Sequence, residues 1–157
     1  MGQKSIEQFT KEVLGFALIA FDSACFIYHI EENKRYTPLT EILFEVLLPK
    51  GRINSVCSTL VLTEVLTRPM VEKRQDLVLA YKSLIASFPH IVLHPFDGAI
   101  AESAAFFRAK YDLRTPDAMH IATAYEAGAQ AIICNDTKWK KVKEIAVLVL
   151  DDYLTKN

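Results

Sequence analysis

Four acidic residues are the side chains whose type and position along the chain indicate chemistry. Asp22 follows an apolar run, FALIAF, and Asp136 lies just past a second apolar run, AIIC. Such runs are typical of strands that are buried on both faces of a parallel sheet. Open parallel sheets bind ligands outside the carboxyl ends of their strands. We therefore expect Asp22 and Asp136 to face one crevice.

The other two acids are expected on helices. Asp117 lies in the first turn of a helix that Thr115 and Pro116 begin, where free N–H groups and the helix dipole favour an anion. Glu64 lies about a turn and a half past the start of its helix. Each acid also has a simpler interpretation, namely an N-cap for Asp22, an ordinary first-turn acid for Asp117, a turn residue for Asp136 and a solvated helix face for Glu64. The positions of the four acids along the chain allow them to form one cluster, but the same positions also fit these simpler roles.

Four carboxylates in one pocket have a chemical consequence. They repel one another, so each pKa is pushed upward. A divalent cation removes this penalty, and a set of oxygen ligands without His or Cys favours Mg²⁺ or Mn²⁺ over zinc. An ion held in this way activates water and offsets the negative charge that develops when a phosphodiester is cleaved.

The elements that must position these acids alternate between strand and helix. Strands are expected at residues 16–21, 53–57, 91–93, 131–134 and 147–150. Helices are expected at residues 5–14, from 23 to about 30, 38–51, from 59 to an end set by Pro69, 71–88, 97–111 and 115–128. This alternation predicts an α/β fold with a parallel sheet and helices on both faces.

Composition narrows the class of protein. The 157 residues suit one domain, and 51% hydrophobic with 24% charged residues provide a sizeable core. The formal net charge of −1 lacks the basic balance of many nucleic-acid-binding proteins, although a local basic patch is compatible with it. Cys25, Cys57 and Cys134 are expected to be buried free thiols in a reducing compartment. With no signal-like N-terminus and no spanning apolar stretch, the sequence predicts a cytoplasmic protein without membrane contact.

Around the acids, the sequence resembles the PIN-domain family, including the VapC-type toxins of bacterial and archaeal toxin–antitoxin pairs. The matching segments are FDSACFIY, STLVLTEVL, LRTPDAMHIATA and CNDTKW, which come in the family's order and span about residues 16–151. The resemblance implies a three-layer α/β/α sandwich as a single domain over residues 1–157, preceded by a short lead-in helix. It also implies metal-dependent cleavage of single-stranded RNA, a homodimer and a small antitoxin partner.

The resemblance also assigns roles to individual residues. It implies a catalytic set of Asp22, Glu64, Asp117 and Asp136, of which the three aspartates hold Mg²⁺, with Mn²⁺ as a substitute. Ser23 matches a small polar residue that holds a metal-bound water, and Asn135 matches the polar residue that precedes the last acid. Cys134 departs from the family, in which many members have Thr. All four acids are present, which argues against a degenerate, non-catalytic copy.

Basic and aromatic residues near the acids are weaker candidates. Nearby basic side chains are expected to hold the RNA phosphate, and the candidates are Arg114, Lys138, Lys140 and Lys141. For the lysines, a solvated helix face is the competing interpretation. Trp139 either stacks on a base or belongs to the core. His120, one turn after Asp117, is interpreted as a packing residue or as a hydrogen-bond partner behind the site.

Several functions compete for this pattern. A toxin ribonuclease neutralised by an antitoxin and a stand-alone PIN-type RNA-processing nuclease are nearly indistinguishable from the sequence. A receiver-like signalling domain would need an acidic pair near the first strand and a Lys-Pro after a late strand, but Asp22 is single and no Lys-Pro occurs. A phosphatase of the Asp-x-Asp type fails because Ala24 occupies the second Asp position.

Overall fold

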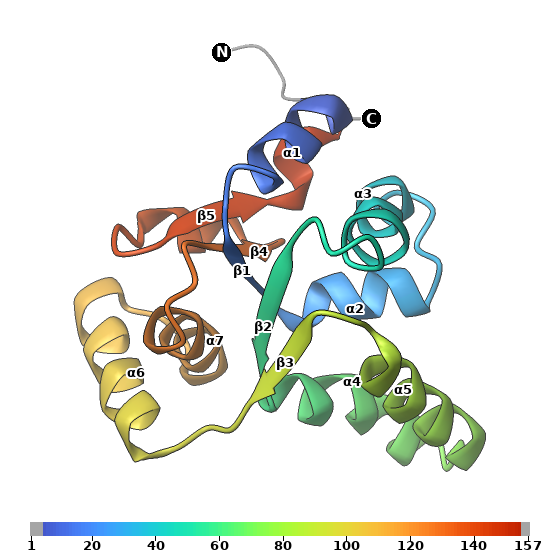
Figure 1. Cartoon of the computed structure of the whole chain (residues 1–157). Coiled ribbons are helices and arrows are strands. Elements are labelled where there is room, and N and C mark those ends of the chain that lie inside the picture. The colour runs from blue at the N-terminus through green and yellow to red at the C-terminus, as the bar shows by residue number, and fades with distance from the viewer. Residues whose placement is uncertain (1–4, 155–157) are drawn as a thin grey trace.

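The computed structural model describes residues 5–154, which form a parallel sheet covered by helices (Figure 1). Within this range the sheet has five strands in the order β3-β2-β1-β4-β5, and every neighbouring pair is parallel. The strands are β1 (Leu18–Phe21), β2 (Asn54–Ser58), β3 (Ile91–His94), β4 (Ala131–Cys134) and β5 (Ala146–Val149). The expected α/β class with a parallel sheet is confirmed.

Helices cover both faces of the sheet. They are α1 (Ile6–Val13), α2 (Ser23–Ile30), α3 (Thr37–Glu41), the π-helix η1 (Ile42–Leu47), α4 (Leu60–Val71), α5 (Gln75–Ser87), α6 (Gly98–Tyr111) and α7 (Thr115–Glu126), with 3₁₀ turns η2 (Thr137–Lys141) and η3 (Leu150–Tyr153). Figure 1 shows α6 and α7 on one side of the sheet and α2 to α5 on the other. No helix in the described part of the chain is long and apolar enough to span a membrane.

The apolar run of β1 supplies both halves of the core. Ile19 and Phe21 belong to the cluster beneath α2 to α5, whereas Ala20 belongs to the cluster beneath α6 and α7. Successive side chains of a strand point to opposite faces, so a strand covered on both sides must be apolar throughout. Phe21 packs edge-on against Phe44, with ring centroids 5.5 Å apart. Because of this double coverage, β1 ends at a place where a following polar residue is positioned rigidly.

The chain reverses its direction of travel across the sheet at β1. From β1 it moves outward to β2 and β3, and it then returns to the other side of β1 to form β4. The two strands on either side of this switch point are hydrogen-bonded, with Phe21 opposite Ile133. The crevice at such a switch point is the usual ligand site of an open α/β sheet. It lies where Asp22 and Asp136 follow their strands.

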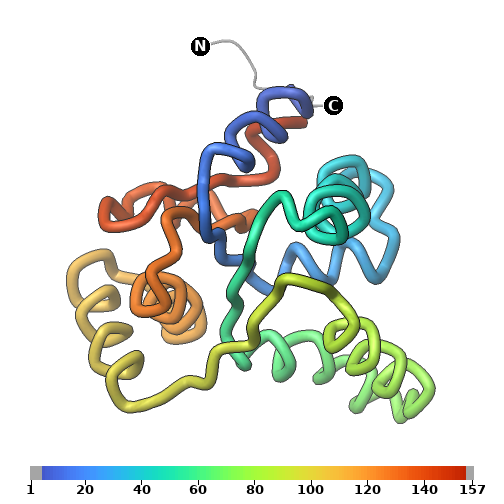
Figure 2. The backbone as a smooth tube through the Cα atoms, viewed as in Figure 1, coloured from blue at the N-terminus to red at the C-terminus, as the bar shows by residue number. Residues whose placement is uncertain are grey.

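The expected lead-in helix is present as α1, and it packs against the last described turn. The rings of Phe9 and Tyr153 meet edge to face, with centroids 4.9 Å apart. The Tyr153 hydroxyl donates a hydrogen bond to Glu12 Oε2 at 2.5 Å. Figure 2 shows these first and last described segments side by side. The helix thus closes the core beneath η3 and is not a loose extension.

Several expected helix boundaries were wrong. The helix expected over residues 38–51 ends at Leu47, and its second half is the π-helix η1. Pro69 was expected to end its helix, but α4 continues through Pro69 to Val71. Proline lacks one N–H and therefore removes only one hydrogen bond so near the helix end, and its ring is buried. The next helix begins at Gln75 and not at residue 71, because the chain turns at Lys73, whose φ is 55°.

The helix that carries Asp117 has no side-chain cap at its start. Thr115 and Pro116 begin the helix as expected, but Arg114 is the N-cap and no side chain makes a capping hydrogen bond. Pro116 lies within the first two helical positions, where its missing N–H is of no consequence. Asp117 remains in the first turn, as expected.

Asp97 caps α6, and its contact leads to a stability prediction. Its Oδ1 accepts a hydrogen bond from the Ile100 N–H at 3.0 Å, at the start of α6. Asp97→Ala is expected to lower the free energy of unfolding by about 1 kcal/mol, whereas Asp97→Asn should change it little because Asn caps equally well. Urea unfolding followed by circular dichroism measures both values. Equal losses in the two variants would contradict the assigned contact.

Candidate active site

Asp22 combines a capping role with an unusual electrostatic environment. It ends β1, and its Oδ1 accepts hydrogen bonds from the N–H groups of Ala24 at 3.0 Å and Cys25 at 3.4 Å. The residue is only 8% exposed. Burial raises the pKa of Asp22 to about 7, and the charge of Glu64 adds to this effect, while His120 and the two backbone donors oppose it. The capping interpretation is therefore confirmed, but it is not the whole description.

Glu64 is held by two residues from other elements. Its Oε2 lies 2.7 Å from Nε2 of His120, which projects from α7 and is 4% exposed. A further hydrogen bond comes from the Ser23 hydroxyl on α2. Burial raises the pKa of Glu64, but the hydrogen bonds from His120 and Ser23 and the charges of His120 and Arg114 outweigh burial and leave it below its ordinary value. Glu64 is thus an ionised, oriented carboxylate and not part of a solvated face. The second interpretation of His120, a hydrogen bond behind the site, is confirmed.

Asp117 and Asp136 both lie within electrostatic reach of Arg114. Asp117 receives two hydrogen bonds from Arg114, Nε to Oδ2 at 2.9 Å and Nη2 to Oδ1 at 3.1 Å. Asp136 Oδ1 accepts the Lys138 N–H at 2.9 Å and so caps η2. Hydrogen bonding and the charge of Asp117, followed by the charges of Asp136 and Glu64, raise the pKa of Arg114. One guanidinium therefore lies within electrostatic reach of three of the four acids.

The charges of the four acids act on groups at the carboxyl ends of β1 and β4. The negative charge of Glu64 raises the pKa of Asp22. The charges of Asp22, Asp136 and Asp117 likewise raise the pKa of the Cys134 thiol. Within residues 5–154, however, no three His, Cys, Asp or Glu side chains stand close enough together to hold a metal ion. In this arrangement, Glu64 is paired with His120 and Asp117 with Arg114.

The donor chemistry of this group nevertheless fits a hard divalent cation. All four side chains offer carboxylate oxygens, the ligands that Mg²⁺ and Mn²⁺ prefer. Asp22 is the decisive residue, because its buried carboxyl has a pKa of about 7 and no cationic side chain hydrogen-bonded to it among the described residues. A cation at this position would lower that pKa and make the ionised form stable near neutral pH.

Cys134 and Asn135 support the end of β4 in different ways. The Cys134 thiol donates to the carbonyl of Asp136 at 3.7 Å, and burial raises the pKa of this thiol. Asn135 donates from Nδ2 to the Tyr28 hydroxyl at 3.2 Å and accepts the Asp151 N–H at 3.0 Å. Asn135 thus ties β4 to α2 and η3, which fixes the backbone just before Asp136.

The basic and aromatic candidates for RNA binding differ in their contacts and in their exposure. Lys138 is exposed beside Asp136, whereas Lys140 pairs with Asp152 at 2.7 Å. Trp139 is 2% exposed and lies in the core, so its core interpretation is confirmed and stacking on a base is not available to it. The side chain of Arg114 is 72% exposed.

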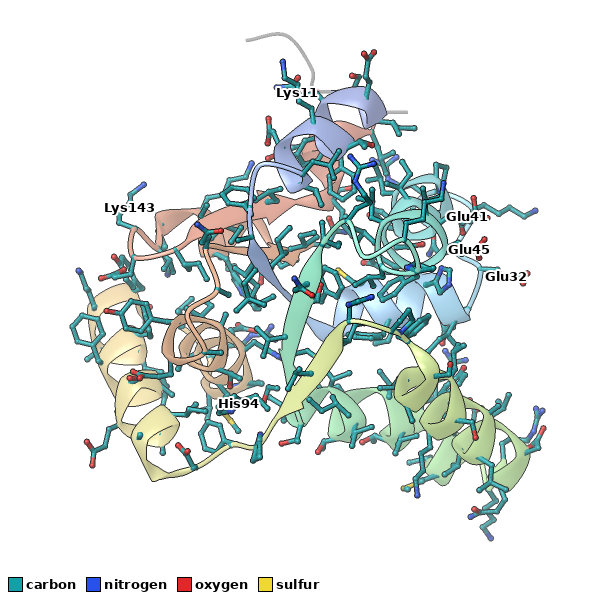
Figure 3. The ribbon with its side chains drawn as sticks, viewed as in Figure 1. Lys11, Glu32, Glu41, Glu45, His94 and Lys143 are labelled. Carbon is teal, nitrogen blue, oxygen red and sulfur yellow. The ribbon has the colours of Figure 1, made fainter. Side chains whose placement is uncertain are left out.

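Sequence reasoning missed a cleft that opens beside Glu64. It has a volume of about 450 Å³ and lies between α2, α4 and α5, lined by Ile27, Ile30, Glu31, Glu64, Val65, Arg68, Pro69, Glu72, Leu77 and Tyr81. A separate acidic group, Glu32, Glu41 and Glu45, lies around His29 near the start of α3 (Figure 3). The cleft has no local sequence signal, because its lining comes from separate segments of the chain.

The fold and the site together define a class of protein. It is an α/β protein with an acidic site at the switch point of a parallel sheet, and its chain matches the family model described as "PIN domain" over residues 19–145. The chain therefore belongs to the PIN-domain family. This family consists of nucleases and generally uses a divalent metal.

Solved structures with the same fold come from bacterial toxin–antitoxin complexes. A chain of VapBC2 from Rickettsia felis, bound to a DNA fragment from its promoter, superposes with a TM-score of 0.67 at 13% identity, over 84% of this chain and 98% of that one. A chain of DNA-bound VapBC from Salmonella typhimurium gives 0.66 at 14% identity, over 84% and 97%. A toxin–antitoxin complex from Klebsiella pneumoniae gives 0.62 at 17% identity, over 84% and 97%. No curated protein matches the sequence. At these identities, the structural likeness establishes the fold.

Proposed function

We propose that this protein is a Mg²⁺-dependent endoribonuclease that cleaves phosphodiester bonds of RNA. The observation that carries this proposal is the buried Asp22 carboxyl, whose pKa is raised to about 7 by burial and by the charge of Glu64, at the switch point of a PIN fold. Membership of a nuclease family supports the reaction type. The choice of RNA as substrate rests on the resemblance to VapC-type ribonucleases.

In this proposal, Asp22, Asp117 and Asp136 hold the ion, and Mn²⁺ can replace Mg²⁺. When bound, the ion neutralises charge on the scissile phosphate and acidifies the attacking water. Glu64 is kept ionised by His120 and Ser23, so its carboxylate accepts a hydrogen bond from that water and orients it for in-line attack. Arg114 and Lys138 lie where they can hold the phosphate, and Lys140 does so after leaving Asp152.

We further propose that the protein is the toxin of a toxin–antitoxin pair, that it forms a homodimer and that it works in the cytoplasm. The likeness to chains of toxin–antitoxin complexes supports a small antitoxin partner. Three buried, unpaired cysteines are consistent with a reducing compartment. The second candidate is a stand-alone PIN-type nuclease that processes RNA, which the same fold and site support equally. A neighbouring open reading frame that encodes a short DNA-binding protein, and that suppresses toxicity when co-expressed, distinguishes the two.

The nuclease proposal is tested by metal removal. Purified protein is incubated with a 5′-labelled single-stranded RNA in Mg²⁺, in Mn²⁺ and in EDTA, beside Asp117→Asn. We expect cleavage in either metal, none in EDTA, and recovery when metal is restored, with the variant inactive throughout because it loses a charged metal ligand. Arg74→Gln is the control, since its ion pair with Asp76 lies outside the acidic group. Equal cleavage by the wild type and Asp117→Asn would indicate a contaminant and contradict the proposal.

A further inference from the structure

Arg114 makes the most specific ion pair of the site. Its planar guanidinium meets Asp117 through two parallel hydrogen bonds, Nε to Oδ2 at 2.9 Å and Nη2 to Oδ1 at 3.1 Å. Both carboxylate oxygens of Asp117 are therefore engaged by one cation. The Asp117 side chain is 13% exposed and that of Arg114 is 72% exposed. The acid is thus enclosed by the protein while the guanidinium lies at the open side.

The position of Arg114 lets its side chain move without disturbing the fold. Its backbone is extended, with φ −66° and ψ 153°, and its carbonyl accepts the Ala118 N–H at 3.0 Å at the start of α7. These backbone contacts remain when the side chain rotates. Lys140, another cation near the acids, is instead paired with Asp152 at 2.7 Å. The charge of Arg114 interacts with those of Asp117, Asp136 and Glu64.

We propose that Arg114 is a phosphate-binding residue that Asp117 holds until a divalent cation displaces it. This inference rests on the proposed nuclease function and adds a coupling between metal and RNA to it. The two cations compete for the same acid, because a metal ion needs an oxygen of Asp117 that the guanidinium now occupies. Once displaced, the guanidinium remains beside the metal and exposed to solvent. A planar, doubly donating group of this kind binds a phosphate through two hydrogen bonds.

The coupling has a definite sign. Metal binding must first break the Arg114–Asp117 pair, so the pair weakens metal affinity. RNA binding then gains a guanidinium that is no longer engaged, so metal strengthens RNA binding, and by linkage RNA strengthens metal binding to the same extent. Removing Arg114 should therefore move the two affinities in opposite directions. A residue with a purely structural role would not separate them.

The first measurement is metal affinity without RNA. Mn²⁺ is titrated calorimetrically into the metal-free wild type, Arg114→Gln and Arg74→Gln. Arg74 is a matched control, because it also makes a two-bond pair with an aspartate, Nε and Nη2 to Asp76 at 2.9 and 2.7 Å. Exposed ion pairs are weak, so we expect Arg114→Gln to bind Mn²⁺ about three- to tenfold more tightly. Arg74→Gln should match the wild type.

The second measurement is single-turnover RNA cleavage at saturating Mn²⁺. Arg114→Gln is expected to cleave at least about tenfold more slowly, because it lacks the two hydrogen bonds to the phosphate. Arg114→Lys should retain part of the rate, since it keeps the charge without the planar geometry. Unchanged Mn²⁺ affinity in Arg114→Gln, or tighter Mn²⁺ binding with a full cleavage rate, would overturn the inference while leaving the nuclease proposal intact. A wild type that neither binds Mn²⁺ nor cleaves RNA would overturn both.

Discussion

An Asp22→Asn variant is expected to lose RNA cleavage and yet to be more stable than the wild type in the absence of metal. Removing a charged metal ligand should slow cleavage by about 10³-fold or more. The amide keeps the shape of the side chain and caps a helix as well as a carboxylate does. The two hydrogen bonds from the N–H groups of Ala24 and Cys25 therefore remain available. The change removes mainly the charge.

The gain in stability follows from the raised pKa of Asp22. The pKa is about 7 in the folded protein, against 3.8 for an ordinary Asp. The folded state therefore binds this proton more tightly, and the stabilisation from the proton is complete below pH 4 and lost as the pH rises to 7. The difference of about three pKa units corresponds to about 4 kcal/mol. Asn has no charge to bury, so the variant should gain most of this energy at pH 8 and almost none at pH 4.

Urea unfolding in EDTA at pH 4, 6 and 8 measures this effect. Asp97→Asn is the matched control, because Asp97 is also a helix cap but is exposed and lies outside the acidic group. Its stability relative to the wild type should not follow the pattern of Asp22→Asn. Adding Mn²⁺ at pH 8 should stabilise the wild type and leave Asp22→Asn almost unchanged. A variant that is less stable than the wild type at pH 8, or a difference independent of pH, would contradict the assignment.

His120→Ala is expected to impair both stability and cleavage, because it removes the donor that orients Glu64. The bond from His120 Nε2 to Glu64 Oε2 is 2.7 Å long and lies behind the site. Loss of a hydrogen bond to a charged group, together with the small cavity that remains, should cost about 2–3 kcal/mol of stability. We expect cleavage to fall by about 10- to 100-fold. His120→Gln retains an N–H donor and should recover part of the rate.

The pH dependence of cleavage distinguishes orientation of Glu64 from simple destabilisation. His120 lowers the pKa of Glu64 through a hydrogen bond and through its charge. Without it, burial prevails, so the acidic limb of the rate profile should move to higher pH in His120→Ala. Thr123→Ala is the control, since Thr123 is buried on the same helix and bonds only the Met119 carbonyl through its hydroxyl. It should lose stability without moving the limb, and an unmoved limb in His120→Ala would contradict the role.

Much of the fold was predictable because its signals are local. A continuous apolar run is sufficient to indicate a strand covered on both faces, and β1 and β4 lie where such runs occur. Asp22 and Asp97 are short acceptors placed just before apolar helices, and both make capping bonds. One error arose where burial overrides a local rule. Pro69 is tolerated inside α4 because its ring is packed and the helix ends two residues later.

The sequence by itself determined which residue types follow the strands and begin the helices, and it therefore indicated the four acids. Only the tertiary structure decided how these acids are partnered. It places β4 beside β1, brings His120 to Glu64 across 56 positions of the chain, and turns Arg114 onto Asp117. It also gives Asp22 a pKa of about 7. The physical reason is that hydrogen-bond partners and desolvation depend on which segments pack together, and no local pattern of residues contains that information.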